Sequence, residues 1–155
     1  MTSEIGPQRL DRTIMCYRIG DPDGRFPIYD PRGSARYPGR WNELDIPVIY
    51  ASEHYSTAML EVLANGHGES PPNQHYISIT VPKGTSYEIV TKDHLTGWDA
   101  LDPKASREFG TRWFREARSA ILLVPSYVAR IERNVVINPA HVDAAGVDTS
   151  LPEPV

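Results

Sequence analysis

Short strands, interrupted by two helices, account for most of the apolar pattern along this chain. Apolar and polar residues alternate over residues 74–81, which predicts a strand with Ile77, Ile79 and Val81 on one face. A continuous apolar run at residues 120–124 predicts a central strand that is buried on both faces. Further strands are expected at residues 13–19, 48–51, 85–90 and 134–138.

Two stretches have helical spacing instead. The first begins near His54, and Ser52 is its expected N-cap. Its apolar stripe comprises Ala58, Met59, Val62 and Leu63. The second covers residues 105–118, with Asp102 and Pro103 as the expected N-cap and first residue. Short strands with two separated helices predict an α+β fold, with a mixed β-sheet core and flanking helices.

The length and composition support a single domain. The chain has 155 residues, of which 40% are hydrophobic and 23% are charged, values typical of a soluble globular protein. Its 14 prolines favour short elements joined by turns over a helical bundle. We expect residues 1–12 to form a flexible leader, residues 13–142 the functional domain, and residues 143–155 a tail.

Charge and cysteine content narrow the possible partners. With 16 Lys and Arg against 20 Asp and Glu, the net charge is −4, which argues against direct binding of nucleic acid. The single cysteine, Cys16, cannot form an internal disulfide and fits a reducing cytoplasm. No apolar run approaches the length of a membrane span, and residues 1–12 lack the apolar region of a signal peptide. We therefore expect a cytoplasmic protein without membrane contact.

Several common catalytic motifs do not occur in the sequence. It has no glycine-rich phosphate loop of the Rossmann or P-loop type. It has neither a cysteine pair nor a His-x-x-x-His helix, so no metal site is expected. Ser126 does not lie in a Gly-x-Ser-x-Gly elbow, so a hydrolase triad is not supported.

The segment from Gly39 to Glu61 carries the strongest chemical signal. Arg40 and Tyr50 are 10 residues apart, and Tyr50 and Glu61 are 11 residues apart. If Ile49 points into the core, Tyr50 points the other way and can line a cleft. Glu61 lies roughly 130° from the middle of its helix's apolar stripe and so leaves the core side. Each residue alone has an ordinary structural explanation, but a guanidinium, a phenol and a carboxylate together predict a site.

Basic residues precede this segment. Arg18 lies in an apolar strand, where it is either an edge residue reaching water or a buried anion-binding residue; both readings stay open. Residues 20–38 are expected to form a long functional or mobile loop. Three arginines make this loop locally basic: Arg25, Arg32 and Arg36.

Five motifs in a fixed order identify a resemblance. They are Gly39-Arg40-Trp41-Asn42, Tyr50-Ala51-Ser52, Ala58-Met59-Leu60-Glu61, Pro125-Ser126 and Asn138-Pro139-x-His141. With them the chain resembles the RES domain family, whose name-giving Arg, Glu and Ser match Arg40, Glu61 and Ser126. The resemblance implies an ADP-ribosyltransferase fold of the diphtheria-toxin type. It also implies a bacterial type II toxin that consumes NAD+ and an Xre-like antitoxin that covers its cleft.

The resemblance and the chemistry suggest roles for single residues. Cleavage of the nicotinamide–ribose bond passes through an oxocarbenium-like state, which Glu61 would stabilise. Arg40 would clamp the pyrophosphate, and Tyr50 would stack on nicotinamide with its hydroxyl near the ribose. Ser126 would hydrogen-bond the nicotinamide amide or the ribose. Supporting contacts are expected from Arg18 and Asn138. The acceptor of ADP-ribose is a protein side chain, water or phosphate.

Two other functions remain alternatives. One is a ribonuclease-type toxin that uses His54 or His141 together with Arg40. The other is a non-catalytic binding module, in which Arg40 and Glu61 form a salt bridge. A homodimer is compatible with the sequence, although no residue pattern indicates one.

Overall fold

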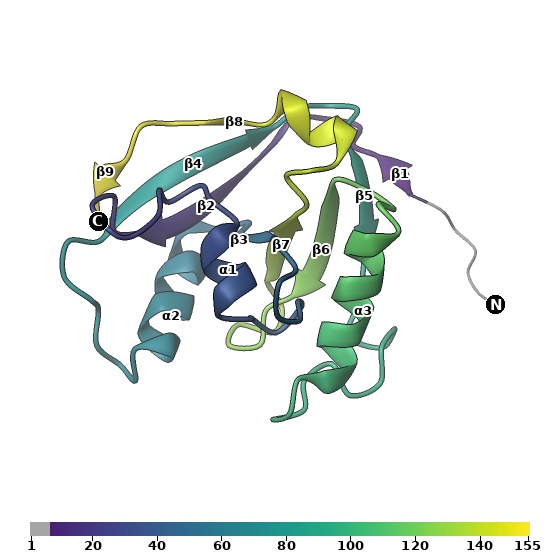
Figure 1. The fold of residues 1–155 in the computed structure, drawn as a ribbon, viewed down its shortest axis with the longest axis horizontal. Coiled ribbons are helices and arrows are strands. Elements are labelled where there is room, and N and C mark those ends of the chain that lie inside the picture. The colour runs from purple at the N-terminus through teal and green to yellow at the C-terminus, as the bar shows by residue number, and fades with distance from the viewer. Residues whose placement is uncertain (1–6) are drawn as a thin grey trace.

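A computed structural model describes residues 7–155 and contains three α-helices, one 3-10 helix and a nine-stranded sheet (Figure 1). The elements are β1 (Gln8–Arg9), β2 (Ile14–Gly20), α1 (Arg32–Arg36), β3 (Ile49–Ser52), α2 (Tyr55–Asn65), β4 (His75–Val81), β5 (Ser86–Ile89), α3 (Lys104–Arg115), β6 (Ile121–Pro125), β7 (Arg133–Ile137), η1 (Val142–Gly146), β8 (Asp148–Thr149) and β9 (Glu153–Pro154). This architecture confirms the predicted α+β fold with a mixed sheet.

The strand order follows the burial pattern of the sequence. The sheet runs β1-β5-β6-β7-β3-β2-β4-β8, and β9 also pairs with β4. The pair β5 and β6 is parallel, whereas the other described pairs are antiparallel, which makes the sheet mixed. Every residue of β6 is buried, which confirms the prediction of a central strand from its continuous apolar run.

Both faces of the sheet are covered. Ile121 and Leu123 of β6 belong to one hydrophobic cluster, and Leu122 and Val124 belong to a second on the opposite face. Trp113 of α3 packs into the second cluster, so α3 covers that face of the sheet, and it lies beside β5 and β6 in Figure 1. The two-sided burial explains why these strands read as continuous apolar runs rather than as alternating ones.

The strands β2 and β3 meet at a single position, where Tyr17 pairs with Ser52. Over the same length, β2 is fully paired on its other edge with β4, and β3 is fully paired with β7. Beyond the bridge, the Tyr50 carbonyl accepts a hydrogen bond from the side chain of Arg18 instead of from the backbone of β2. The sheet therefore carries a local gap between two of its central strands.

Several local predictions were wrong. Ser52 is the last residue of β3 and not a helix cap; His54 is the N-cap of α2. Pro103 rather than Asp102 is the N-cap of α3, and that helix ends at Arg115 because Ala117 has a positive φ of 49°. The expected loop at residues 20–38 contains the short helix α1.

The segment that we expected to be a tail packs on the domain. Its strands β8 and β9 pair with the outer edge of β4, whose backbone groups would otherwise lack partners there. Of the expected leader, residues 8–9 form β1 on the edge of β5, while residues 1–6 lie outside the described residues.

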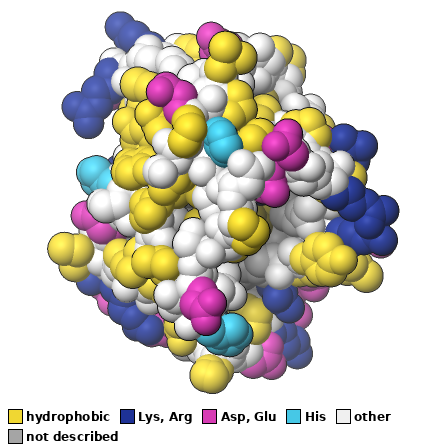
Figure 2. Space-filling view, turned by 90° about the vertical axis from the view of Figure 1, so that its left-hand side faces the viewer, with side chains coloured by type: hydrophobic (Ala, Val, Ile, Leu, Met, Phe, Trp, Pro, Cys, Tyr) yellow, Lys and Arg dark blue, Asp and Glu magenta, His cyan; other side chains and the backbone are white. Residues whose placement is uncertain are grey.

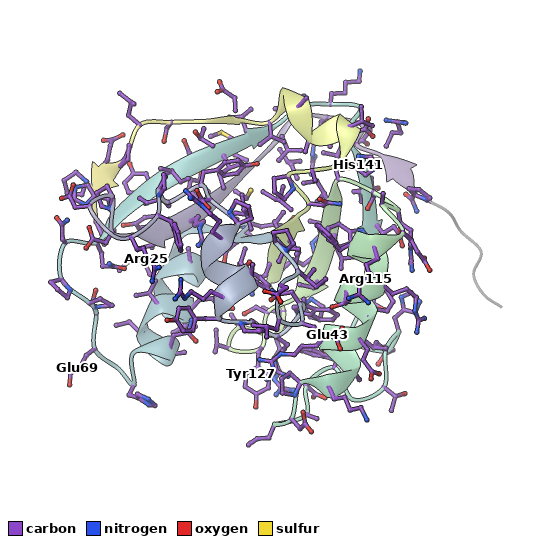
Figure 3. The ribbon with its side chains drawn as sticks, in the orientation of Figure 1. Arg25, Glu43, Glu69, Arg115, Tyr127 and His141 are labelled. Carbon is purple, nitrogen blue, oxygen red and sulfur yellow. The ribbon has the colours of Figure 1, made fainter. Side chains whose placement is uncertain are left out.

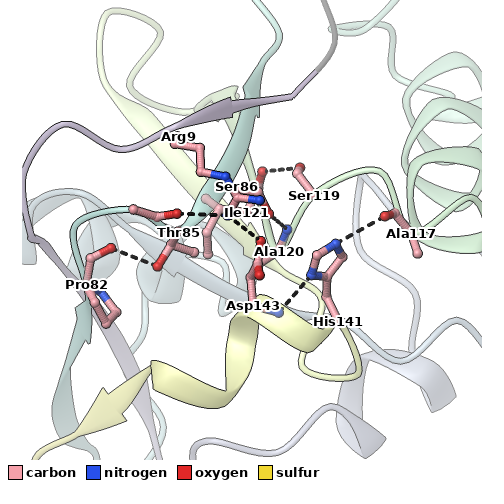
Figure 4. Close-up of polar contacts among 11 residues, drawn as sticks. Arg9, Pro82, Thr85, Ser86, Ala117, Ser119, Ala120, Ile121, His141 and Asp143 are labelled. Atoms are coloured by element: carbon pink, nitrogen blue, oxygen red, sulfur yellow. Dashed lines mark hydrogen bonds and ion pairs between the residues drawn. The ribbon is translucent and has the colours of Figure 1, made fainter.

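A polar network anchors the start of this C-terminal segment (Figure 4). The carboxylate of Asp143 accepts a hydrogen bond from Arg9 Nη1 at 3.0 Å, and the side chain of Ser86 lowers the pKa of this carboxylate. The backbone N–H of Asp143 donates to Nδ1 of His141, whose Nε2 contacts the Ala117 carbonyl oxygen at 3.1 Å. These contacts join η1 to β1, β5 and the end of α3.

Candidate active site

A cleft of about 740 Å³ opens at the gap between β2 and β3. Residues of both strands line it, together with α2, the segment before β3, the start of α3 and the segment after β6. Four of the predicted site residues line this cleft: Arg18, Arg40, Tyr50 and Glu61. Arg40, Tyr50 and Glu61, which are separated by 10 and 11 residues in the sequence, thus line the same cleft.

Glu61 reaches the cleft from α2 and is held through one oxygen. Its Oε2 accepts hydrogen bonds from Ser126 Oγ at 2.9 Å and from Asn134 Nδ2 at 2.6 Å. Asn134 is itself oriented by Ser52, whose Oγ donates to Asn134 Oδ1 at 2.7 Å. No residue in the described part of the chain donates to Oε1 of Glu61. The carboxylate is therefore fixed in direction and keeps one oxygen for a ligand.

Strand register brings these partners together. Asn134 pairs with Ser52 of β3 on one side and with Val124 of β6 on the other. Ser126 follows β6 directly, so it emerges at the same end of the sheet as Asn134. The helix α2 begins just beyond the same end of β3, which places Glu61 over both side chains.

Arg40 is held at the edge of the cleft by carbonyls and an aromatic ring. Its Nη1 donates to the carbonyl oxygens of Trp98 at 2.9 Å and Ala100 at 2.8 Å. Its guanidinium carbon lies 4.0 Å from the ring centroid of Tyr127, within the range of a cation–π contact. Burial lowers the pKa of Arg40 from its usual value, but guanidinium remains charged at neutral pH.

Tyr50 supports the loop that carries Arg40. Its hydroxyl donates to Asn42 Oδ1 at 2.6 Å and accepts from the Trp41 backbone N–H at 2.9 Å. Burial raises the pKa of this phenol, so it stays protonated. Gly39 lies against its ring, where a Cβ would stand only 2.7 Å from a ring carbon. The hydroxyl therefore has two hydrogen-bond partners within the protein itself.

Arg18 lies inside the sheet rather than at its edge. Its Nε donates to the Ile28 carbonyl oxygen at 2.7 Å, and its Nη1 donates to the Tyr50 carbonyl oxygen at 2.9 Å. Burial lowers the pKa of Arg18 from its usual value. Within residues 7–155, no acceptor contacts its Nη2, so one arm of this guanidinium remains for a ligand in the cleft.

Asn138 does not line the cleft. It follows β7, where its backbone N–H donates to the Ala120 carbonyl oxygen and its Oδ1 accepts from the Ala140 N–H at 3.0 Å. The asparagine at the cleft is Asn134, which lies in β7 near the opposite end of the strand. Asn138 therefore lies apart from the other predicted site residues, because the length of β7 separates it from Asn134.

Among the residues at the cleft that were not predicted from the sequence are Arg107, Tyr127 and Asn134. Arg107 comes from α3, and its Nε donates to the Gly39 carbonyl oxygen at 2.7 Å. A polar residue on a predicted helix gives no signal of such a contact, because the contact depends on how α3 packs. Tyr127 directly follows Ser126 of the Pro125-Ser126 motif, and this position next to a motif residue is a sequence signal for it.

The charged side chains of the cleft are mostly basic. Three arginines and one glutamate line it, so the cleft carries a net positive charge although the whole chain is acidic. On the face that Figure 2 shows, which is the left-hand side of the view in Figure 1, acidic and basic side chains are interspersed. A positive cleft attracts and orients anionic ligands.

The geometry weakens both alternative functions. His54 pairs with Glu132 at 2.5 Å, and His141 belongs to the network at η1, at the far end of the sheet from Tyr127 (Figure 3). Neither histidine lines the cleft. Among the described residues, Arg40 and Glu61 do not form the salt bridge expected of a non-catalytic module.

The fold defines the class of protein first. A chain of the "M.tuberculosis MbcT-MbcA toxin-antitoxin complex" superposes with a TM-score of 0.77, covering 97% of this chain and 87% of that chain. At 17% identity this likeness concerns the fold alone, and it agrees with the predicted α+β architecture. The RES domain profile matches residues 15–154, and the chain belongs to the RES domain family.

Curated relatives support the same assignment. The "Prs ADP-ribosylating toxin" of Sphingobium sp. (strain YBL2) is 40% identical over 114 residues, covering 70% of this chain and 71% of the relative. A "Toxin Res" of Photorhabdus laumondii subsp. laumondii is 34% identical over 129 residues, covering 81% of this chain and 82% of the relative. The chain is therefore a toxin-type member of its family.

Two general properties complete the description. No helix within residues 7–155 has the length and apolar character needed to cross a membrane. In the same range, no three His, Cys, Asp or Glu side chains gather as a metal site would require.

Proposed function

We propose that this chain is the toxin of a bacterial type II toxin–antitoxin system, which binds NAD+ in the cleft and cleaves its nicotinamide–ribose bond. Membership of the RES domain family and the toxin names of the relatives support the proposal. The observation that carries it is the carboxylate of Glu61, fixed through one oxygen at the wall of a positively charged cleft.

Glu61 is the catalytic residue in this proposal. As the N-glycosidic bond breaks, its electron pair goes to the nicotinamide nitrogen, and positive charge develops on the ribose ring. Nicotinamide leaves as a neutral molecule, so no strong acid is needed. The free oxygen of Glu61 holds a ribose hydroxyl and stabilises the developing charge. Ser126 and Asn134 keep the carboxylate in the required direction.

Arg40 binds the pyrophosphate through its unused donors. Its Nε and Nη2 have no acceptor among residues 7–155, and such a fork suits bidentate binding of a phosphate. Tyr50 contributes the wall of the cleft, and its hydroxyl positions the loop of Arg40. The Nη2 of Arg18 supplies a supporting contact to the substrate from β2, across the gap from β3.

An oxygen or nitrogen of the acceptor then forms a bond to the oxocarbenium-like carbon, and any proton that this atom carried passes to solvent water. The acceptor is a protein side chain, water or phosphate. The name of the Sphingobium relative favours a protein side chain. Incubation of lysate with labelled NAD+ separates these outcomes: label on a protein band indicates transfer, and free labelled ADP-ribose indicates hydrolysis.

An antitoxin that covers the cleft is part of the proposal. The superposing chain was solved as part of a toxin–antitoxin complex, and this supports a partner of the same kind. Both proteins would act in the cytoplasm, where a single buried thiol such as Cys16 remains reduced.

The variant Glu61→Gln tests the function. A glutamine oxygen can still accept from Ser126 and Asn134, so the fold is retained while the charge is lost. We expect release of nicotinamide from NAD+ to fall by about 10²–10³-fold. Glu69→Gln is the matched control, because Glu69 is exposed and lies away from Tyr127 (Figure 3). Turnover of Glu61→Gln at the wild-type rate would refute the assignment.

A further inference from the structure

A second guanidinium, that of Arg107, enters the cleft from α3. Its Nε donates to the Gly39 carbonyl oxygen at 2.7 Å, and its Nη2 donates to the Pro38 carbonyl oxygen at 3.2 Å. These two carbonyls directly precede Arg40 in the chain. The packing of α3 therefore sets a second cation beside the loop that carries the first.

Both guanidiniums keep free donors. A guanidinium has five N–H donors. Arg40 uses two of them on the carbonyls of Trp98 and Ala100, and Arg107 uses two on those of Gly39 and Pro38. Three N–H groups of each side chain are left without an acceptor among the described residues. Neither guanidinium is thus saturated by the protein.

Neither cation is neutralised by a carboxylate. Five other arginines form ion pairs with Asp or Glu: Arg9, Arg32, Arg118, Arg130 and Arg133. Within residues 7–155, Arg40 and Arg107 form none, and both are tied to backbone carbonyls instead. Arg18 also lines the cleft without a carboxylate partner among the described residues, and a group of such cations in one cleft indicates an anionic ligand.

We propose that Arg107 binds the pyrophosphate of the dinucleotide together with Arg40, so that each guanidinium takes one phosphate. The inference rests on the proposed function, since it concerns the same cleft and the same substrate. The ring of Tyr127, stacked on Arg40, keeps that side chain facing the cleft, while the carbonyls of residues 38 and 39 do the same for Arg107.

A purely structural Arg107 makes a different prediction. If it only tethered the loop at residues 38–39, its loss would disturb Arg40 and Tyr50 together and would lower stability and kcat. If it binds phosphate, its loss weakens the binding of any ligand with a pyrophosphate. In that case the substitution leaves kcat nearly unchanged, because the bond that breaks joins nicotinamide to the ribose and not to the pyrophosphate.

The experiment uses Arg107→Gln, Arg107→Lys and, as a control on the same helix, Arg115→Gln. Arg115 is exposed, and it lies on the same helix α3 (Figure 3). Calorimetry with ADP measures the anion site without requiring turnover. We expect Arg107→Gln to weaken ADP binding by about 10–100-fold, the range for a lost charged hydrogen bond. Arg107→Lys should recover part of this loss, and Arg115→Gln should bind as the wild type does.

Kinetics with NAD+ provides the second measurement. We expect Arg107→Gln to raise KM by a similar factor with kcat within about twofold of wild type. Unchanged ADP binding in Arg107→Gln, no ADP binding by the wild type, or a loss confined to kcat would each overturn the proposal. Wild-type protein that binds ADP through Arg107 but releases no nicotinamide would instead refute the proposed function alone.

Discussion

Removing the hydroxyl of Tyr50 separates a positioning role from a catalytic one. In Tyr50→Phe, Asn42 Oδ1 keeps the hydrogen bond that it accepts from the Gly39 N–H at 2.8 Å. The Trp41 N–H loses the hydrogen bond that it donates to this hydroxyl, and it makes no other within the described residues. Trp41 is only 3% exposed, so water replaces the lost partner poorly. The substitution therefore leaves one buried donor unsatisfied.

The cost follows from that single donor. An unsatisfied buried N–H costs about 1–3 kcal/mol. In a domain of this size, each kcal/mol lowers Tm by about 2–4 °C, so we expect a decrease of roughly 2–12 °C. Arg40 lies directly before Trp41 in the chain, so a loosened loop also raises KM for NAD+.

Urea unfolding followed by tryptophan fluorescence measures the effect, because Trp41, Trp98 and Trp113 are all buried. Tyr87→Phe is the matched control: its hydroxyl donates to Gln8 Oε1 at an exposed site, and we expect a change within about 0.5 kcal/mol. Tyr50→Phe with wild-type stability but much slower nicotinamide release would show that the hydroxyl acts on the substrate directly.

Two further predictions concern packing and pH. Gly110→Ala should lower the free energy of unfolding by at least about 1–3 kcal/mol, since a Cβ would meet the Trp41 carbonyl oxygen at 1.8 Å. Gly33→Ala, with no atom within 4 Å of its Cβ, should be neutral or raise the free energy by up to about 1 kcal/mol; equal effects in the two variants would contradict the packing argument. The Ser86 side chain, and after it the charge of Arg9, holds the pKa of Asp143 in the folded protein below the usual value of 3.8. The ionised carboxylate therefore stabilises the folded protein above pH 3.8, and this stabilisation is lost as the pH falls through the pKa of the folded state. When the pH is lowered from 4, the free energy of unfolding in urea should therefore fall less for Asp143→Asn than for the wild type. Identical pH profiles for the two proteins would refute the role of this carboxylate.

Much of the fold could be predicted from local patterns. The alternation at residues 74–81 predicted β4, and the burial of Ile77, Ile79 and Val81 confirms the predicted face. The failures lie at element ends and in the proline-rich loop. Serine is a common helix N-cap, but the hydroxyl of Ser52 donates a hydrogen bond to Asn134 Oδ1 instead of capping α2. A local preference of this size is easily outweighed by one tertiary hydrogen bond.

The site was only partly accessible from the sequence. The spacing of Arg40, Tyr50 and Glu61 indicated a shared cleft, and the structure brings all three to its lining. The roles of these side chains remain predictions. Asn138 was chosen by its place in a motif, whereas Arg107 had no sequence signal at all.

The sequence by itself determined where the longer strands and the two main helices form, which faces they bury, and which residue types carry chemistry. These properties depend on neighbours within a few positions, where periodicity and propensity act. Only the tertiary structure decided that Ser126 and Asn134 both donate hydrogen bonds to the same carboxylate oxygen of Glu61. They lie 65 and 73 residues from it in the sequence. The physical reason is that an apolar strand specifies the face that it buries but not its lateral neighbours. The pairing of β3 with β7, and of β7 with β6, had to form before these side chains could meet.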